Sequence, residues 1–110
     1  MVLVSANNIY CTKGDTLETV LILKYPDGTI YEPEDGDELW FTVKSTYEDS
    51  LPMFKKKVSN ETMTLVLESD ETSILNPEDS YVFDVELRVG DYVQTVIVGN
   101  LIITNEVKDV

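Results

Sequence analysis

Histidine is absent from this 110-residue sequence, and cysteine occurs only once, as Cys11. The chain therefore lacks the commonest general base and metal ligand, and it has no Ser-His or Cys-His nucleophile pair. A single cysteine excludes an intrachain disulfide, and Cys11 is expected to be a small buried apolar group. The five glycines lie apart, so there is no glycine-rich phosphate loop. These absences predict a protein that is not an enzyme and that uses no cofactor or metal.

Basic residues are also scarce, because eight Lys and Arg stand against 21 Asp and Glu and give a formal net charge of −13. Such a chain is repelled by phosphates and by anionic lipid, so neither nucleic acid nor a membrane surface is expected as a partner. No apolar run approaches the roughly 20 residues that span a bilayer, and the N-terminus does not resemble a signal peptide. We expect a soluble protein made in the cytoplasm. Its acids serve solubility or dock on a basic partner.

Six of the acids gather in the stretch 27–38 with no base among them. Oxygen-rich loops of this kind attract Ca²⁺, but the spacing does not match an EF-hand, and a turn rich in Pro, Gly and Asp needs no ion to explain it. A catalytic carboxylate pair would need a cleft, for which a small domain leaves little room. Solvated turn carboxylates are the favoured interpretation, with a Ca²⁺ site as the alternative.

Alternation of apolar and polar residues is what the chain does contain. From Tyr81 to Val89 every second residue is apolar or aromatic, and the residues between are mostly charged. Because successive side chains on a strand point to opposite faces, this pattern predicts a sheet with one buried and one solvated face. Gly90 and Asp91 then separate two such runs, which indicates a hairpin.

Turn signals at short spacing divide the chain into further strands. The expected strands are 8–12, 16–24, 29–31, 38–44, 53–59, 61–68, 80–89 and 92–104, with a bend or bulge at Gly99-Asn100. A single helical turn is expected over 70–77, with Asp70 as the N-cap and Pro77 as the terminator. About seven or eight strands predict one domain, residues 1–110. We expect it to be all-β, folded as an immunoglobulin-like antiparallel β-sandwich.

The inward residues of these strands form the predicted core. They are Leu21, Leu23, Leu39, Phe41, Val43, Leu65, Leu67, Tyr81, Phe83, Val85, Leu87, Val96 and Val98. The run 16–24 is apolar on both faces near its end, which indicates a central strand covered on both sides, or a helix. The three lysines 55–57 indicate an edge strand that charge protects from pairing with another sheet, with a local basic patch as the alternative.

Trp40 and Thr42 are expected on the outward face of their strand, near a polar loop, 45–52, that contains Tyr47. An outward Trp is most often covered by a neighbouring strand or loop. Aromatic anchors ringed by polar residues are also the usual centre of protein interfaces, and exposed aromatic rings can form platforms for sugars. We therefore take Trp40, Thr42 and Tyr47 as the candidate interface residues.

Several motifs, in their order along the chain, resemble a phage module. They are Lys13-Gly-Asp-Thr16, Tyr25-Pro-Asp-Gly28 with Tyr31, Gly36-Asp37 leading to Phe41-Thr-Val-Lys44, Asp70-Glu-Thr72 with Leu75, Tyr81-Val-Phe-Asp-Val-Glu-Leu87, and Thr95-Val-Ile-Val-Gly-Asn-Leu-Ile-Ile-Thr104 ending at Glu106-Val107. Together they resemble a small β-sandwich domain of tail and baseplate proteins in phages and prophages of Gram-positive bacteria. The family that they resemble is the N-terminal domain of the baseplate upper protein of lactococcal-type phages.

The resemblance implies a structural virion part, made in the bacterial host cytoplasm, that is not an enzyme and contacts other tail proteins. In larger relatives the module attaches a receptor-binding or fibre region, whereas this chain stops at Val110. A stand-alone accessory protein or a fragment of a longer protein is therefore expected. Because the net charge makes copies repel one another, we expect a monomer or weak oligomer that joins a symmetric assembly in the particle. The alternative function, motivated by Trp40 and the tyrosines, is a carbohydrate-binding or adhesive module for host cell-surface polysaccharide.

Overall fold

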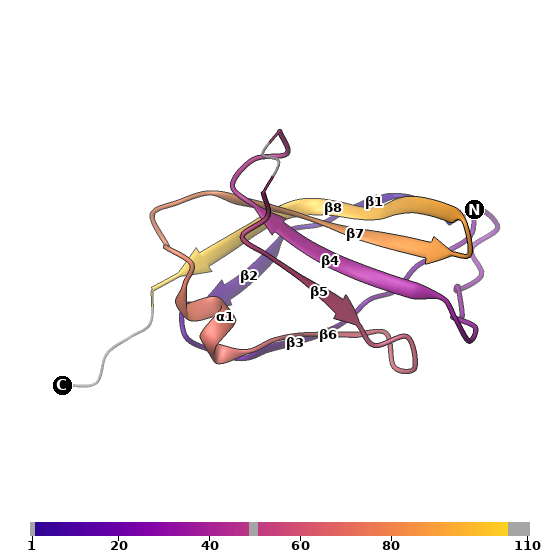
Figure 1. Cartoon of the computed structure of the whole chain (residues 1–110), viewed down its shortest axis with the longest axis horizontal. Coiled ribbons are helices and arrows are strands. Elements are labelled where there is room, and N and C mark those ends of the chain that lie inside the picture. Colours follow the sequence, from indigo (N-terminus) through magenta and orange to yellow (C-terminus); the bar gives the residue numbers. More distant parts are fainter. Residues whose placement is uncertain (1, 49–50, 106–110) are drawn as a thin grey trace.

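The computed structural model describes residues 2–48 and 51–105, and most of its regular structure is β-strand (Figure 1). This confirms the prediction of an all-β fold. One five-residue helix, α1 (Ser69–Ser73), lies between β6 and β7. The strands are β1 (Ser5–Ala6), β2 (Ile9–Thr12), β3 (Leu17–Val20), β4 (Glu38–Lys44), β5 (Phe54–Val58), β6 (Thr64–Leu67), β7 (Tyr81–Val89) and β8 (Tyr92–Thr104).

The larger of two sheets has the strand order β1-β8-β7-β4-β5, and β2 pairs with β8 on the same edge as β1. The pairs among β5, β4, β7 and β8 are antiparallel, whereas β1 and β2 run parallel to β8. The prediction of an antiparallel arrangement throughout is therefore wrong at the N-terminus. A tight turn forces neighbouring strands to be antiparallel, but no such turn joins β1 or β2 to β8.

The smaller sheet consists of β3 and β6, which pair antiparallel. The run 16–24 was expected to be covered on both faces or helical, and this expectation is wrong. Leu21 and Leu23 are buried, but Val20 and Ile22 are 62% and 59% exposed, because alternate side chains of an extended chain point to opposite faces and only one face of this run packs on the core. The expected strand 29–31 is reduced to a single bridge between Lys24 and Ile30.

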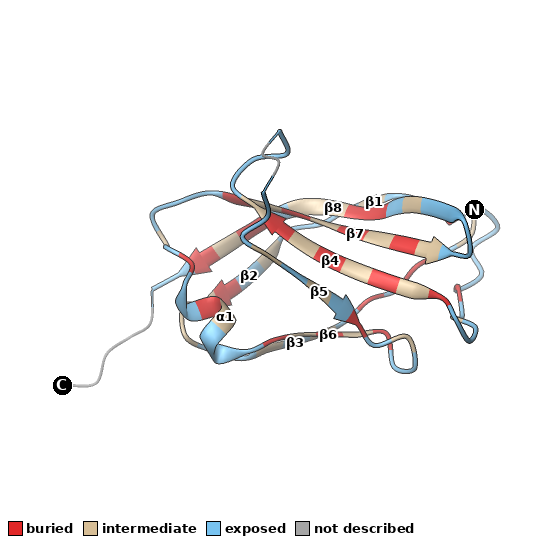
Figure 2. Cartoon of the chain, viewed as in Figure 1, coloured by how far each residue is buried: buried red, intermediate tan, exposed pale blue. Residues whose placement is uncertain are grey.

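Side chains from both sheets enclose one hydrophobic core, and Figure 2 shows the alternation of buried and half-buried residues along β4. Twelve of the thirteen predicted core residues are buried. The rings of Phe41 and Phe83 pack at its centre, with their centroids 5.4 Å apart. Cys11 is also buried, as predicted, and burial raises the pKa of its thiol.

The exception among the core residues is Val98, which is only half-buried, and the cause is a bulge in β8. The register with β7 shifts between Val85 and Glu86, because β8 carries one extra residue, Val96. Val96 and Ile97 are consequently both buried. The alternation beyond the bulge is displaced by one residue, and this turns Val98 to the outer face.

The expected irregularity at Gly99-Asn100 therefore lies three residues too far along the chain. Gly99 has a different role, because a Cβ there would sit 1.5 Å from the carbonyl oxygen of Asn7. The N–H of Asn7 donates to the carbonyl of Val98 at 2.9 Å, so the chain between β1 and β2 presses closely on β8. Only glycine leaves room for this approach.

Two local predictions have different outcomes. Helix α1 begins after Glu68, which takes the N-cap position predicted for Asp70, and it ends at Ser73, before Pro77. A capping box accounts for the earlier start: the Glu68 N–H donates to the side chain of Glu71 at 2.9 Å, while the Glu68 side chain accepts from the backbone N–H of Glu71. The hairpin is where it was expected, with Val89 paired to Tyr92.

No helix of the described residues is long and apolar enough to cross a membrane.

The lysine-rich strand β5 is the last strand of the larger sheet, which confirms the prediction of an edge strand. Lys56 faces the core side, where its Nζ lies 2.6 Å from the carboxylate of Glu71 on α1. Lys55 and Lys57 point to the opposite face. The edge therefore carries charge on both faces, which opposes pairing with a further strand.

We expect Phe83→Ala to lower the free energy of unfolding by ~3–5 kcal/mol, because it removes a ring that is 2% exposed at the centre of the core. That is a large share of the ~5–15 kcal/mol typical of a domain. Urea denaturation measures it. Val93→Ala on the same sheet is the control, since Val93 is 55% exposed and should change stability little. Equal stability of the parent and Phe83→Ala would contradict this account of the core.

Candidate interaction surface

The outward residues of β5, β4 and β7 form a continuous polar surface, which we call the Trp40 face. By register, Trp40 lies between Lys57 and Glu86, and Thr42 lies between Lys55 and Asp84. Alternation along β4 explains why these side chains face outward while their neighbours enter the core. The Trp40 face comprises Glu38, Trp40, Thr42, Lys44, Lys55, Lys57, Asp84, Glu86 and Arg88.

Trp40 is half-buried and is held by side chains of all three strands. The Nζ of Lys55 lies 5.3 Å from its ring centroid, and the guanidinium carbon of Arg88 lies 5.8 Å from it. Both distances are within the range of a cation–π interaction. The indole Nε1 donates to Glu38 Oε1 at 3.0 Å. Trp40 is therefore partly covered by long charged side chains of neighbouring strands and held in one position.

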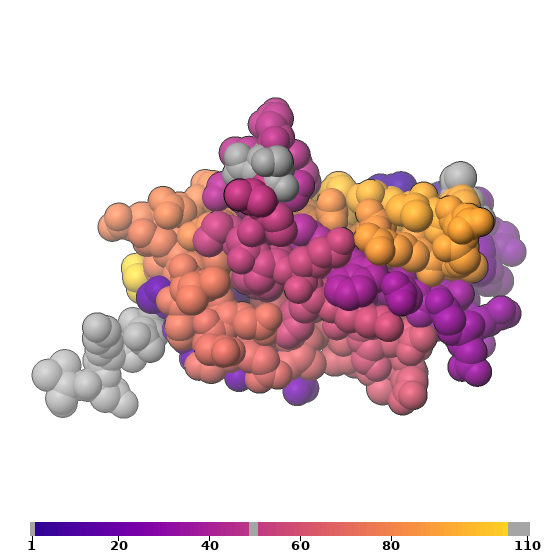
Figure 3. Space-filling view, viewed as in Figure 1, coloured from indigo at the N-terminus to yellow at the C-terminus, as the bar shows by residue number. Residues whose placement is uncertain are grey.

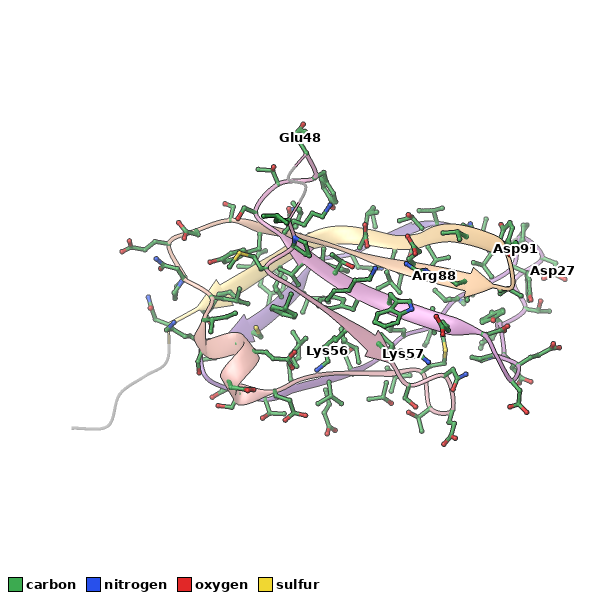
Figure 4. The ribbon with its side chains drawn as sticks, in the orientation of Figure 1. Asp27, Glu48, Lys56, Lys57, Arg88 and Asp91 are labelled. Carbon is green, nitrogen blue, oxygen red and sulfur yellow. The ribbon has the colours of Figure 1, made fainter. Side chains whose placement is uncertain are left out.

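The Trp40 face gathers positive charge on an otherwise acidic chain. It holds four of the eight Lys and Arg residues of the sequence, against three acids. Arg88 pairs with Glu86 at 2.6 Å, and Lys57 lies 3.6 Å from Glu38; Figure 4 shows Lys57 and Arg88 on the two sides of β4. The hydrogen bond from Trp40 and the charge of Lys57 lower the pKa of Glu38.

Asp84 is the least favourably placed charge on this face. Burial raises its pKa, and the nearby carboxylate of Glu86 raises it further. The charges of Lys44 and Lys55 act in the opposite direction but do not cancel these effects. The face therefore keeps one carboxylate whose ionisation costs free energy in the folded state.

Tyr47 lies over β7 and β8 and does not contact Trp40 through any recorded interaction of the described residues. Its ring is 52% exposed, while its hydroxyl donates to the Gly99 carbonyl at 3.0 Å and accepts from the Gly99 N–H at 3.2 Å. Residues 45–48 stand out from the body of the molecule (Figure 3), and residues 49 and 50 of the predicted loop 45–52 lie outside the described residues. The structure thus brings Trp40 and Thr42 together on one face of β4, whereas it anchors Tyr47 to Gly99 of β8.

Sequence reasoning missed the two cations that flank Trp40. The lysines 55–57 were interpreted as edge protection, and Arg88 was assigned only to a solvated face. The alternation along β5 contains a signal for Lys55 and Lys57, because it places both on one face with Lys56 on the other. Their contact with Trp40 depends on strand order and register, which the alternation does not contain.

Two acids of the stretch 27–38, Asp27 and Asp37, stabilise turns. Within the described residues, no group of three or more His, Cys, Asp or Glu side chains is placed to hold a metal ion. Asp27 accepts from the N–H of Thr29 at 3.0 Å and from its hydroxyl at 2.7 Å. Asp37 is buried and accepts from the hydroxyl of Tyr31 and from the N–H of Glu34. These contacts are typical of side chains that close their own turns.

Comparison with known proteins does not assign the chain to a family. No protein-family model matches it, and a search of curated proteins finds no match. The resemblance to phage tail and baseplate domains therefore rests on the motifs themselves and continues as a proposal.

We expect Asp84→Asn to raise the free energy of unfolding near pH 7. The raised pKa means that the folded protein favours protonated Asp84, so this contribution is present below the unfolded-state pKa and is lost as the pH rises through the folded-state pKa. Removing the charge should therefore raise the free energy of unfolding at about pH 7, where Asp84 is ionised, and should change it little at about pH 3, where Asp84 is already protonated. Urea denaturation at both pH values measures the difference. Asp91→Asn, in the exposed hairpin turn, is the control; a loss of stability of Asp84→Asn at pH 7 would show that Lys44 and Lys55 dominate.

Proposed function

We propose that this chain is a non-enzymatic structural and attachment module of a phage or prophage tail particle, at its baseplate. It acts in the virion through protein–protein contacts, after synthesis in the host cytoplasm. The motif resemblance supports this role. An immunoglobulin-like sandwich is part of the same proposal. Two sheets around a common core favour it, and the parallel strands β1 and β2 on β8 are a variation on it.

One observation carries the proposal: a half-buried Trp lies between two cations on a polar sheet face. Trp and Arg are among the residues that contribute most to binding energy at interfaces, above all where polar neighbours exclude water around them. Trp40 is already held by Lys55, Arg88 and Glu38, so little side-chain entropy is lost when a partner covers it. A rigid aromatic anchor of this kind suits repeated contacts in a particle.

The charge of the Trp40 face indicates which kind of partner surface can bind to it. The Trp40 face has a small excess of positive charge on a chain of net charge −13, so its complement is an acidic surface with an apolar patch opposite Trp40. The acid-rich turns of another copy offer such charge. A head-to-tail contact between copies would generate a ring if the rotation closes, which agrees with the symmetry of a tail.

We expect the isolated protein to be a monomer or weak oligomer at low salt, because copies of net charge −13 repel one another. Salt shortens the range of this repulsion, to about 10 Å at 0.1 M. Because the positive excess of the Trp40 face is small, the repulsion between whole copies outweighs its attraction to acidic turns, so any contact between copies should become stronger as salt is raised from low to moderate concentration. Sedimentation velocity measures this. A stable oligomer that dissociates on adding salt would contradict the role assigned to repulsion.

We expect Trp40→Ala to weaken binding to the neighbouring tail or baseplate protein about 30-fold, since a central hot spot contributes at least ~2 kcal/mol. Co-purification with the proteins of adjacent tail genes, followed by titration, measures the change. Thr64→Ala is the control, because Thr64 is half-buried on β6 in the other sheet. Thermal unfolding of both variants verifies that each is folded.

Two outcomes would contradict the proposal. Equal binding of Trp40→Ala and Thr64→Ala would move the interface away from the Trp40 face. Failure to bind any virion protein, together with saturable binding of host polysaccharide, would favour the carbohydrate-binding alternative. That alternative requires an open ring face for a sugar to stack on, whereas Lys55 and Arg88 both lie over the ring of Trp40.

A further inference from the structure

A second surface lies at the end of the molecule formed by the β7–β8 hairpin and the turns between β3 and β4. A pocket of about 290 Å³ opens there, lined by three tyrosines, Tyr25, Tyr31 and Tyr92. Val2 and Leu87 contribute its apolar part. This volume is at the lower end of ligand pockets, which range over roughly 300–1,000 Å³, and so it suits a small chemical group. We call it the tyrosine pocket.

Two of the tyrosines form a corner. The rings of Tyr25 and Tyr31 are inclined at 65°, with their centroids 6.1 Å apart. Tyr31 is only 8% exposed and its hydroxyl donates to buried Asp37, which fixes the ring. Burial and this hydrogen bond raise the pKa of Tyr31 well above its usual range, so the ring remains a neutral phenol. Tyr92, 42% exposed, supplies a more open side of the pocket from the hairpin.

The charge of the pocket has one sign. Glu32, Glu34 and Asp37 line it, and no Lys or Arg is found among its described lining residues. The ion pairs among the described residues involve neither Glu32 nor Glu34. Aromatic rings and uncompensated carboxylates both attract a cation, the rings through their negative faces.

The hydroxyls of Tyr31 and Tyr92 and the side-chain amide of Gln94 are already engaged with the protein. Tyr92 donates to Gln94 Oε1 at 3.0 Å, and Gln94 Nε2 donates to the carbonyl of Val2 at 2.8 Å. Tyr31 is bonded to Asp37. The pocket therefore offers ring faces and the carboxylates of Glu32 and Glu34. A ligand that gains from this combination carries positive charge together with an apolar surface that packs on the rings, which describes an alkylated ammonium group.

We infer that the tyrosine pocket binds a quaternary ammonium group of the choline type. Tyr25 and Tyr31 contact its methyl groups as two walls, Tyr92 covers it from the hairpin, and Glu32 and Glu34 supply long-range attraction at the mouth. This inference is independent of the Trp40 face. The same cation exists as free choline and as a phosphate-linked headgroup, and the pocket chemistry is common to both.

Choline titrated into the full chain at constant ionic strength tests the inference, with binding followed by amide chemical shifts in NMR. We expect saturable binding with shifts centred on Tyr25, Tyr31 and Tyr92. The neutral isostere 3,3-dimethylbutan-1-ol has the same shape without the charge, and it should bind roughly tenfold more weakly. Comparison with phosphocholine separates the two sources: weaker binding identifies the free cation, and equal or tighter binding identifies a phosphate-linked headgroup.

Substitutions make the test specific to the pocket. Tyr92→Leu should weaken choline binding at least fivefold, whereas Tyr92→Phe should retain it, because only the ring face is required. Tyr10→Leu is the matched control, since Tyr10 is 62% exposed on β2 and does not line the pocket. Trp40→Ala should bind choline like the parent. The inference is overturned if choline does not saturate, if the neutral isostere binds equally well, or if Tyr92→Leu binds like the parent.

Discussion

The pairing of β8 with strands from both halves of the chain is the constraint on which the rest of the structure depends. One edge of β8 pairs with β7, and the other edge pairs in parallel with β1 and β2. The extra residue Val96 changes which side chains of β8 enter the core, so Ile97 is buried and Val98 is not. Gly99 then allows Asn7 to approach. A single bulge thus determines how the last strand seals the core and where the N-terminal strands attach.

The Trp40 face follows from register on the other side of β7. Arg88 is opposite Glu38 on β4, and Lys55 is opposite Thr42, so each cation is a diagonal neighbour of Trp40. Diagonal neighbours on adjacent strands lie about 7–8 Å apart, within reach of long side chains. The two cations therefore reach the indole from β7 and β5 at the same time. A one-residue slip of either pair would turn its cation to the opposite face and separate it from Trp40.

Much of the strand pattern was predictable, because alternation with period two reports directly on burial. It placed Leu39, Phe41 and Phe83 in the core and Trp40 and Thr42 outside it, and the turn at Gly90 located the β7–β8 hairpin. Gly90 adopts φ of 59°, which glycine tolerates at the first position of a two-residue turn.

The errors concern properties that belong to pairs of strands. The direction of β1 and β2 and the position of the bulge depend on which strands become neighbours, and the exposure of β3 depends on which of its faces packs against the other sheet. Burial of Val20 and Ile22 would require a further layer packed over the outer face of this run, and their own sequence pattern does not show whether such a layer exists. The flanking cations of Trp40 were missed for the same reason, since their contact requires a register between strands far apart in sequence.

The two candidate surfaces share a strand but lie on opposite faces of it. Leu87 lines the tyrosine pocket, while the next residue, Arg88, points to the Trp40 face. Because successive residues of a strand face opposite sides, a substitution on one surface leaves the side chains of the other in place. Charges on one surface should affect binding at the other only weakly, since exposed charges are screened over about 10 Å at 0.1 M salt. The net charge of −13 therefore mainly affects how fast copies and partners associate. Complementary shape and charge in direct contact with each surface determine which partner remains bound.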